Sequence, residues 1–402
     1  MFPSVPSGST SLSKSVPRVG AAWPLIAAGV LSLIWIPALG RGFSSDDFGV
    51  VPTTWSQFLE SPFGEQMNGR PIEMLTFALL PKQALVHHAL SLLVYLACVG
   101  LMWHVCRRMA LGHWSTFMAL SSFSHPAFLW SVTWIAQRNS LLVILFLLMA
   151  IIATRTPAKL ALIALGSATK SPYVFQNAVF SFQFARRGQL AASAIPLLCM
   201  FIFGLAGYLT YYNRAVGGDT LASLYIPLSV SVPLRIAKLL EGLLYIFAPV
   251  PMFAIVSWGP ILSLVGYAAL WLVVAQSLQP FRAVSTVNGW IPAMAMTMCV
   301  PFVFASEVRV TGEAAVLTFL AIASAAQWRL PGKIAIVGIL VLNLTGIALN
   351  YGTFWSQEYD IHATPISLDD SQPAYVYHAW RENLRQRILA ALGVSAPIRT
   401  LD

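Results

Sequence analysis

Charged side chains are scarce in this sequence. Asp, Glu, Lys and Arg make up 10% of the 402 residues, and only 15 residues are acidic. A soluble domain carries about 25% charged residues, so the composition excludes an ordinary soluble protein. Hydrophobic residues take their place, at 57% with a mean hydropathy of +0.71. Apolar runs recur that are long enough to cross about 30 Å of hydrocarbon. The sequence therefore predicts an all-α polytopic membrane protein that has the lipid bilayer as a partner.

Cysteine is also scarce, and its pattern excludes two further classes. The four cysteines (Cys98, Cys106, Cys199 and Cys299) lie in or beside apolar runs without metal-ligand spacing. They indicate small buried side chains, neither a disulfide framework nor a metal site. The formal net charge of +9 is not gathered on a polar domain, because the basic residues stand at the ends of apolar runs. This is the positive-inside pattern, so we expect no nucleic-acid partner.

The basic residues predict a topology of about 11 spans. We expect residues 1–20 to form a cytoplasmic tail, 21–351 a transmembrane domain and 352–402 a short external tail. The expected spans cover about 21–39, 83–104, 114–130, 137–153, a short hairpin over 158–185, 189–212, 255–277, 287–304, 312–327 and 333–351.

Two segments of this domain are not expected to span the membrane. Loop 40–82 is predicted to be external and to carry juxtamembrane helices. Segment 232–248 is predicted to be an amphipathic helix at the outer surface. Its residues Arg235, Lys238 and Glu241 fall three apart, which places them on one helical face.

Two adjacent acids, Asp46 and Asp47, follow the first apolar stretch in the segment GRGFSSDDFGV. Removing a carboxylate from water is costly, so acids at a bilayer surface tend to be paired, metal-bound or functional. A plainer interpretation also fits, in which one acid caps a helix in a solvated loop. The pair is the first candidate for catalytic chemistry.

Other polar residues are expected on the same side of the membrane as this pair. They are Arg70, Glu73, His87, His88, His125, Arg138, Asn139, Lys170, Glu307, Arg309 and Glu313. Each has a structural interpretation: hydrogen-bonded histidines, snorkelling cations, or an ion pair of Arg309 with a neighbouring glutamate. Together they suit a lipid phosphate, because cations would neutralise the phosphate and an acid would take the proton of a hydroxyl.

Four local patterns carry a resemblance to a known family. They are SSDDF with NGRPIEMLTF; VHHALSLLVYLACVGLMWHVCRR; SHPAFLWSVTWIAQRNSLLVILFLLMAI with LGSATKSPYVF; and EVRVTGEAAVLTFLA with TFWSQEYDIHA. In this order they resemble the GT-C class of integral-membrane glycosyltransferases. The similarity is closest to bacterial relatives of the transmembrane and TPR-containing O-mannosyltransferases. The chain departs from that pattern in having Val310 after Arg309, and in having no TPR repeats.

The resemblance implies a GT-C fold and an inverting sugar transfer from a polyprenyl-phosphate donor. Asp46 or Asp47 would be the general base, and the other would orient the acceptor or hold a divalent metal. Arg138, Lys170 and Arg309 would bind the donor phosphate. Arg70, His87, His88, His125, Asn139 and Glu307 would contact the substrates.

The expected location is a bacterial inner membrane, with the site facing the periplasm. The acceptor would be an envelope glycan or a protein such as a pilin. Two other classes remain open on the sequence. A transporter or flippase of lipid-linked sugars would also need charges within the membrane, although its acids would lie inside spans. A non-catalytic membrane scaffold would have no use for polar groups gathered on one side.

Overall fold

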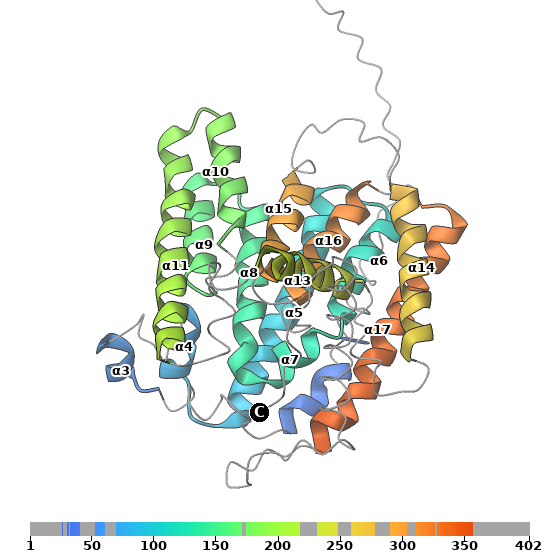
Figure 1. Cartoon of the computed structure of the whole chain (residues 1–402), viewed down its shortest axis with the longest axis horizontal. Helices are drawn as coiled ribbons and strands as arrows, with labels where there is room; N and C mark the ends of the chain where they lie inside the picture. Colours follow the sequence, from blue (N-terminus) through green and yellow to red (C-terminus); the bar gives the residue numbers. More distant parts are fainter. Residues whose placement is uncertain are drawn as a thin grey trace, which may run out of the picture.

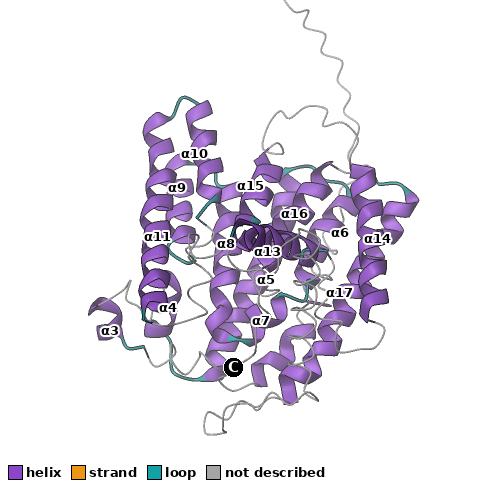
Figure 2. Ribbon diagram, viewed as in Figure 1, coloured by secondary structure: helices purple, strands orange, loops and turns teal. Residues whose placement is uncertain are grey.

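Helices are the main structure in the described part of this protein. The computed structural model describes residues 26, 30–31, 33–40, 53–60, 70–170, 174–217, 231–247, 259–277, 290–303, 311–325 and 328–356. Over these residues the chain forms helices and connecting loops without strands (Figure 2). The predicted all-α class is therefore confirmed.

The helices follow one another through most of the sequence (Figure 1). The α-helices are α3 (Trp55–Glu60), α4 (Pro71–Leu79), α5 (Ala84–Arg108), α6 (His113–Ser121), α7 (Phe128–Thr133), α8 (Arg138–Ile152), α9 (Thr156–Ser167), α10 (Gln176–Arg186), α11 (Leu190–Val216), α13 (Val232–Tyr245), α14 (Gly259–Ser277), α15 (Trp290–Met298), α16 (Thr311–Ala325) and α17 (Leu330–Ser356). Short 3-10 helices are η1 (Ile36–Gly40), η3 (Ser122–Ser124), η4 (Ile135–Gln137) and η9 (Val300–Val303).

Four segments are long and apolar enough to cross a membrane: Ala84–Arg108, Ile135–Ile152, Leu190–Thr210 and Leu330–Leu349. Trp290–Val303 and Thr311–Ala325 are apolar but shorter. These segments support a membrane protein. The larger number of 11 spans stays a prediction.

The expected crossing at 114–130 is interrupted. The chain forms α6, η3 and α7 there, and His125 is extended, with ψ of 131°, between the last two. The reason is Pro126, which lacks an N–H and keeps the residue before it out of helical backbone angles. The hairpin expected at 158–185 is present as α9 and α10.

Basic side chains tie several helix ends together. Arg108 Nη1 donates to the last carbonyl of α8 at 2.6 Å. Lys333, at the start of α17, lies over the Trp114 ring at the start of α6, 5.4 Å from its centroid. Arg186, at the end of α10, lies 5.9 Å from the centroid of Trp290 at the start of α15. These ends form what we call the basic end of the bundle.

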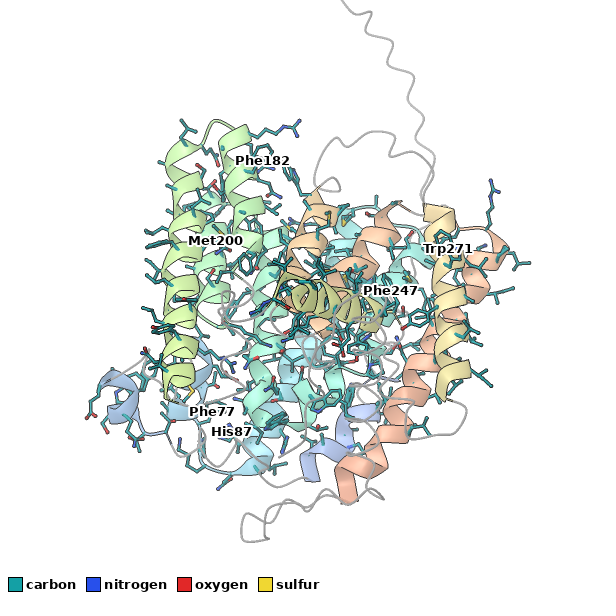
Figure 3. The ribbon with its side chains drawn as sticks, viewed as in Figure 1. Phe77, His87, Phe182, Met200, Phe247 and Trp271 are labelled. Carbon is teal, nitrogen blue, oxygen red and sulfur yellow. The ribbon has the colours of Figure 1, made fainter. Side chains whose placement is uncertain are left out.

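The other end of α5 and α8 is different in character. Figure 3 shows Phe77 and His87 near the lower end of the bundle, whereas Phe182 of α10 lies near the upper end. The first turns of α5 and α8 hold His87, His88, Arg138 and Asn139, all buried. Each of these two helices therefore runs from a buried polar end to the basic end.

The apolar core lies around α5. Tyr95 is fully buried, and its ring makes edge contacts with Trp35, Phe123 and Phe128 at 5.6 to 5.9 Å between centroids. Its hydroxyl donates to the carbonyl of Phe123 at 2.6 Å, so the polar tip of the ring is satisfied inside the core. This packing fixes Trp35, directly before η1, and the turn before α7 against α5.

Helix α13 crosses the direction of α8, α11 and α14 in Figure 1. The predicted helix forms, and its three charged residues share one face. That face is turned into the protein: Arg235, Lys238 and Glu241 are buried, whereas Val232, Ile236 and Leu240 are exposed. The arrangement reverses that of a surface helix whose polar face meets water.

Close packing holds α13 in this orientation. A Cβ added to Gly242 would lie 2.3 Å from Cγ of Phe302 in η9, so only glycine fits there without movement. Arg235 Nη1 donates to the carbonyl of Val303 at 2.9 Å. At the other end, the carbonyl of Tyr245 lies 2.9 Å from Nε2 of His125.

Candidate functional site

The candidate site begins where α4 and α8 start. Pro71 occupies the first turn of α4, where its missing N–H costs no helical hydrogen bond. Glu73 also lies in that turn, where the helix dipole favours an acid. Helix α8 opens with Arg138 and Asn139 directly after η4. Packing of α4 on α8 brings the acid of one helix to the polar start of the other.

Arg138 is fully buried and is surrounded by acceptors. Its guanidinium donates to Ser91 Oγ at 3.1 Å, to Thr76 Oγ1 at 2.9 Å, and to both Nδ1 and the carbonyl of His87 at 3.0 and 3.2 Å. The Phe77 ring lies 5.3 Å from the guanidinium carbon. Because arginine can only donate, Nδ1 of His87 must be an acceptor and the imidazole is neutral.

Glu73 is bound from two sides. Nδ2 of Asn139 donates to its two oxygens at 3.0 and 2.9 Å, and the Asn139 backbone N–H donates at 3.3 Å. Arg70 Nη1 lies 3.5 Å from Glu73 Oε2. Burial raises the pKa of the Glu73 carboxyl, and the charge of Arg70 and the amide of Asn139 oppose that rise. We call Arg70, Glu73, Thr76, His87, Ser91, Arg138 and Asn139 the Arg138 cluster.

A second buried group adjoins this cluster. Lys170 Nζ donates to Ser140 Oγ at 2.8 Å and to Glu313 Oε1 at 3.1 Å. Ser140 in turn donates to Asn139 Oδ1 at a longer 3.4 Å. Lys170 follows the end of α9, and Glu313 lies in the first turn of α16. We call Ser140, Lys170 and Glu313 the hairpin group, because it joins the α9–α10 hairpin to α16.

The charges of the two groups do not balance. Among the residues that the structure describes, they hold three cations and two carboxylates: Arg70, Arg138, Lys170, Glu73 and Glu313. The surplus is one positive charge in a region with little exposure to solvent. Such an arrangement can bind an anion, because a cation interacts more strongly where water is excluded.

The structure brings several of the predicted site residues together. Arg70, His87, Arg138 and Asn139 belong to the Arg138 cluster, and Lys170 connects to it through Ser140. His88 is buried beside His87 in the first turns of α5.

His125 has partners elsewhere. Nδ1 of its ring accepts from the N–H of Ala127 at 3.1 Å, and Nε2 contacts the carbonyl of Tyr245. In this arrangement the ring holds the turn before α7 against α13. The remaining predicted residues, Asp46, Asp47, Glu307 and Arg309, lie outside the described residues.

The sequence groups Glu73 and Glu313 with the polar residues of this side but assigns them no role in the site. It does not point to Thr76, Ser91 or Ser140 as members of the two groups. Helical spacing gives a signal for two of them, since Ser91 comes four residues after His87 and Thr76 three after Glu73.

Metal binding finds no support in the part of the chain that the structure covers. Within that part, no three His, Cys, Asp or Glu side chains gather as a metal site would need. Comparison with known proteins returned no similar family model, curated protein or solved structure.

Proposed function

We propose that this protein is a membrane glycosyltransferase of GT-C type. It would move a sugar from a polyprenyl-phosphate donor to a hydroxyl of an envelope glycan or a protein such as a pilin. The reaction would take place at the periplasmic face of a bacterial inner membrane. The observation that carries the proposal is the surplus positive charge of the Arg138 cluster and hairpin group, placed at the helix ends opposite the basic end.

The cations would act on the donor phosphate. A phosphate that leaves the sugar gains negative charge, and fixed cations stabilise that charge without reorganisation. Arginine suits this role because its planar fork matches two phosphate oxygens. Arg138 and Lys170 would serve from the two buried groups, together with Arg309 of the later turn.

The acid pair would act on the acceptor. Asp46 or Asp47 would take the proton of the acceptor hydroxyl, whose oxygen attacks the anomeric carbon opposite the phosphate and so inverts it. The second carboxylate would orient the acceptor or bind a divalent cation.

The position of Thr53, which follows the acid pair in the sequence, favours this role. Lys82 Nζ donates to the carbonyl of Thr53 at 2.6 Å and also to that of Phe77. Thr53 comes six residues after Asp47. Thr53 is therefore fastened to the last turns of α4, the helix whose first turn carries Glu73 of the Arg138 cluster.

Separate Asp46→Asn and Asp47→Asn variants test the assignment of the base. Transfer from polyprenyl-phosphate sugars is measured with purified protein in nanodiscs, at equal membrane insertion. Loss of a general base should lower the rate about 10²- to 10⁴-fold in one variant. Glu60→Gln, which removes an exposed acid in the same loop, is the matched control and should leave the rate unchanged. Full activity in both Asp variants would overturn the assignment.

Donor binding tests the cations separately from catalysis. Affinity for undecaprenyl phosphate should fall in Arg138→Ala and in Lys170→Ala. Arg138→Lys keeps the charge but loses the fork, so its affinity should be intermediate. Unchanged affinity in both alanine variants would remove the two residues from phosphate binding.

A transporter of lipid-linked sugars is the second candidate, and one observation favours it. Helices α9, α10, α15 and α16 are short, between 9 and 15 residues, and the α9–α10 hairpin meets α16 at the Lys170–Glu313 ion pair. Short paired segments that meet at charged residues are typical of transporter sites. Proteoliposomes with a fluorescent polyprenyl-phosphate sugar separate the candidates, because a transporter moves the lipid without any acceptor. If the protein neither transferred the sugar nor moved the lipid, a non-catalytic membrane scaffold would be the remaining candidate.

A further inference from the structure

Among the residues that the structure describes, three buried oxygen acceptors near the hairpin group have no hydrogen-bond partner. They are Glu313 Oε2, Asn177 Oδ1 and Gln176 Oε1. The three residues are 1%, 1% and 4% exposed. Glu313 stands in the first turn of α16, and the other two open α10.

Two of these side chains are held by their other atom. Asn177 Nδ2 donates to Ser167 Oγ at 2.7 Å, which fixes the start of α10 on the end of α9. Glu313 Oε1 accepts from Lys170 at 3.1 Å. Each side chain is thus fixed in place with one oxygen left as an acceptor.

The same contacts place the acceptors at one end of the hairpin. Lys170 comes three residues after Ser167, so the loop that reaches Glu313 begins at the helix end that holds Asn177. Gln176 is the neighbour of Asn177 in the first turn of α10. The acceptors therefore belong to the two elements that meet at Lys170.

Buried acceptors are rarely left unsatisfied in proteins, because their lost hydration is not replaced. A suitable ligand must bring O–H or N–H donors. An anion is excluded, since all three atoms are oxygens and one belongs to a carboxylate. A cation has little advantage, because Lys170 already offsets the charge of Glu313. A neutral molecule with several hydroxyl groups fits best.

We propose that Glu313, Asn177 and Gln176 form a subsite for the hydroxyl groups of the donor sugar. The assignment rests on the proposed function, in which Lys170 binds the donor phosphate. A sugar bonded to that phosphate would lie beside Glu313. The subsite gives the buried carboxylate beside Lys170 a role. One oxygen of Glu313 binds Lys170, and the other accepts a hydrogen bond from the sugar.

Free methyl glycosides test the subsite without the lipid. Methyl hexopyranosides and pentofuranosides are added at millimolar concentration to the full chain in nanodiscs, and saturation-transfer NMR reports contact. In Glu313→Gln the amide oxygen can still face Lys170 while the amide nitrogen replaces the free acceptor with a donor. Signal from the glycoside that binds best should fall about fivefold, as for one lost hydrogen bond. Gln176→Met should produce a similar loss.

Gln183→Met is the matched control, because Gln183 is a buried glutamine of the same helix, seven residues after Gln176. It should keep the wild-type signal. Glu313→Gln removes the carboxylate partner of Lys170 and should lower the thermal midpoint, so all signals are compared at a temperature where every variant is folded. Equal signals in wild type and variants, or no glycoside signal in wild type, would overturn the subsite.

Binding of undecaprenyl phosphate is measured in parallel to keep the two proposals apart. If the protein still binds the lipid phosphate but no variant changes glycoside contact, the subsite is rejected and the proposed glycosyltransferase function stands. Glycoside contact that depends on Glu313, without lipid-phosphate binding, supports a sugar site and rejects the polyprenyl-phosphate donor.

Discussion

The Arg138 cluster and helix α13 both bury charged side chains, but they do so in different ways. Arg138 donates to side chains of two other helices, α4 and α5. In α13, Arg235 donates to a backbone carbonyl, and Glu241 accepts from Tyr245 of the same helix at 2.6 Å. One region is an assembly of side chains from several helices. In the other, the described contacts are a backbone carbonyl and a tyrosine of the same helix.

The difference indicates in which region the effect of one substitution on stability should extend to several partners. A cluster of side chains that share partners loses several hydrogen bonds when one member is removed. A helix that is held by its backbone and by close packing depends more on shape than on any one charge. The three predictions below test this contrast, from the largest expected effect to the smallest.

Arg138→Leu should have the largest effect on stability. It leaves Ser91, Thr76 and His87 without their buried donor and removes a positive charge near Glu73. We expect a loss of about 4–5 kcal/mol in the free energy of unfolding, measured by thermal unfolding of the purified protein in detergent. Arg155→Leu, at an exposed arginine before α9, should change stability by less than about 0.5 kcal/mol. Equal losses in the two variants would show that the cluster is not a coupled assembly.

The Lys170–Glu313 ion pair should show strong coupling. Lys170→Met leaves Glu313 as a buried charge without its cation and should cost about 3 kcal/mol. Adding Glu313→Met should recover most of this loss, because a buried ion pair is often replaced by apolar side chains at little cost. The four variants of a double-mutant cycle are compared by the same unfolding assay. Additive losses would contradict the pairing.

Gly242→Ala should have the smallest effect of the three, through shape rather than charge. Its new Cβ would meet the Phe302 ring, so η9 must move, and overpacking costs about 1–3 kcal/mol. Gly338→Ala, in a helix where a Cβ meets nothing within 4 Å, is the control and should stabilise α17 by up to about 1 kcal/mol. If Gly242→Ala matched the control, α13 would not be held by its contact with Phe302.

Much of the helical fold could be predicted from apolar runs and basic residues. The second predicted span, 83–104, corresponds to α5, and the short hairpin at 158–185 to α9 and α10. The break inside 114–130 could also have been predicted, since His125-Pro126 is a local signal. The direction of the charged face of α13 could not, because it depends on η9 and His125, which are distant in sequence.

The candidate site was predictable only in part. A common side of the membrane was a sound reason to group Arg138, Asn139 and Lys170, because buried polar groups within a membrane must find one another. Their partners were out of reach of any local pattern. Asn139 binds Glu73 from 66 residues away, and Lys170 binds Glu313 from 143. Helical periodicity extends over a few turns and carries no information at such separations.

The inward-facing charges of α13 also constrain the order in which contacts form during translation. Arg235 donates to Val303, which is synthesised 68 residues later. At about 5–20 residues per second, the ribosome needs roughly 3 to 14 s to supply that partner. His125, the contact at the other end of α13, is already made by then. During this interval the charged face must stay in water or at the bilayer surface. Helix α13 can therefore complete its contacts only after η9 has been made, and a pause in translation between its synthesis and that of η9 would prolong this exposed state.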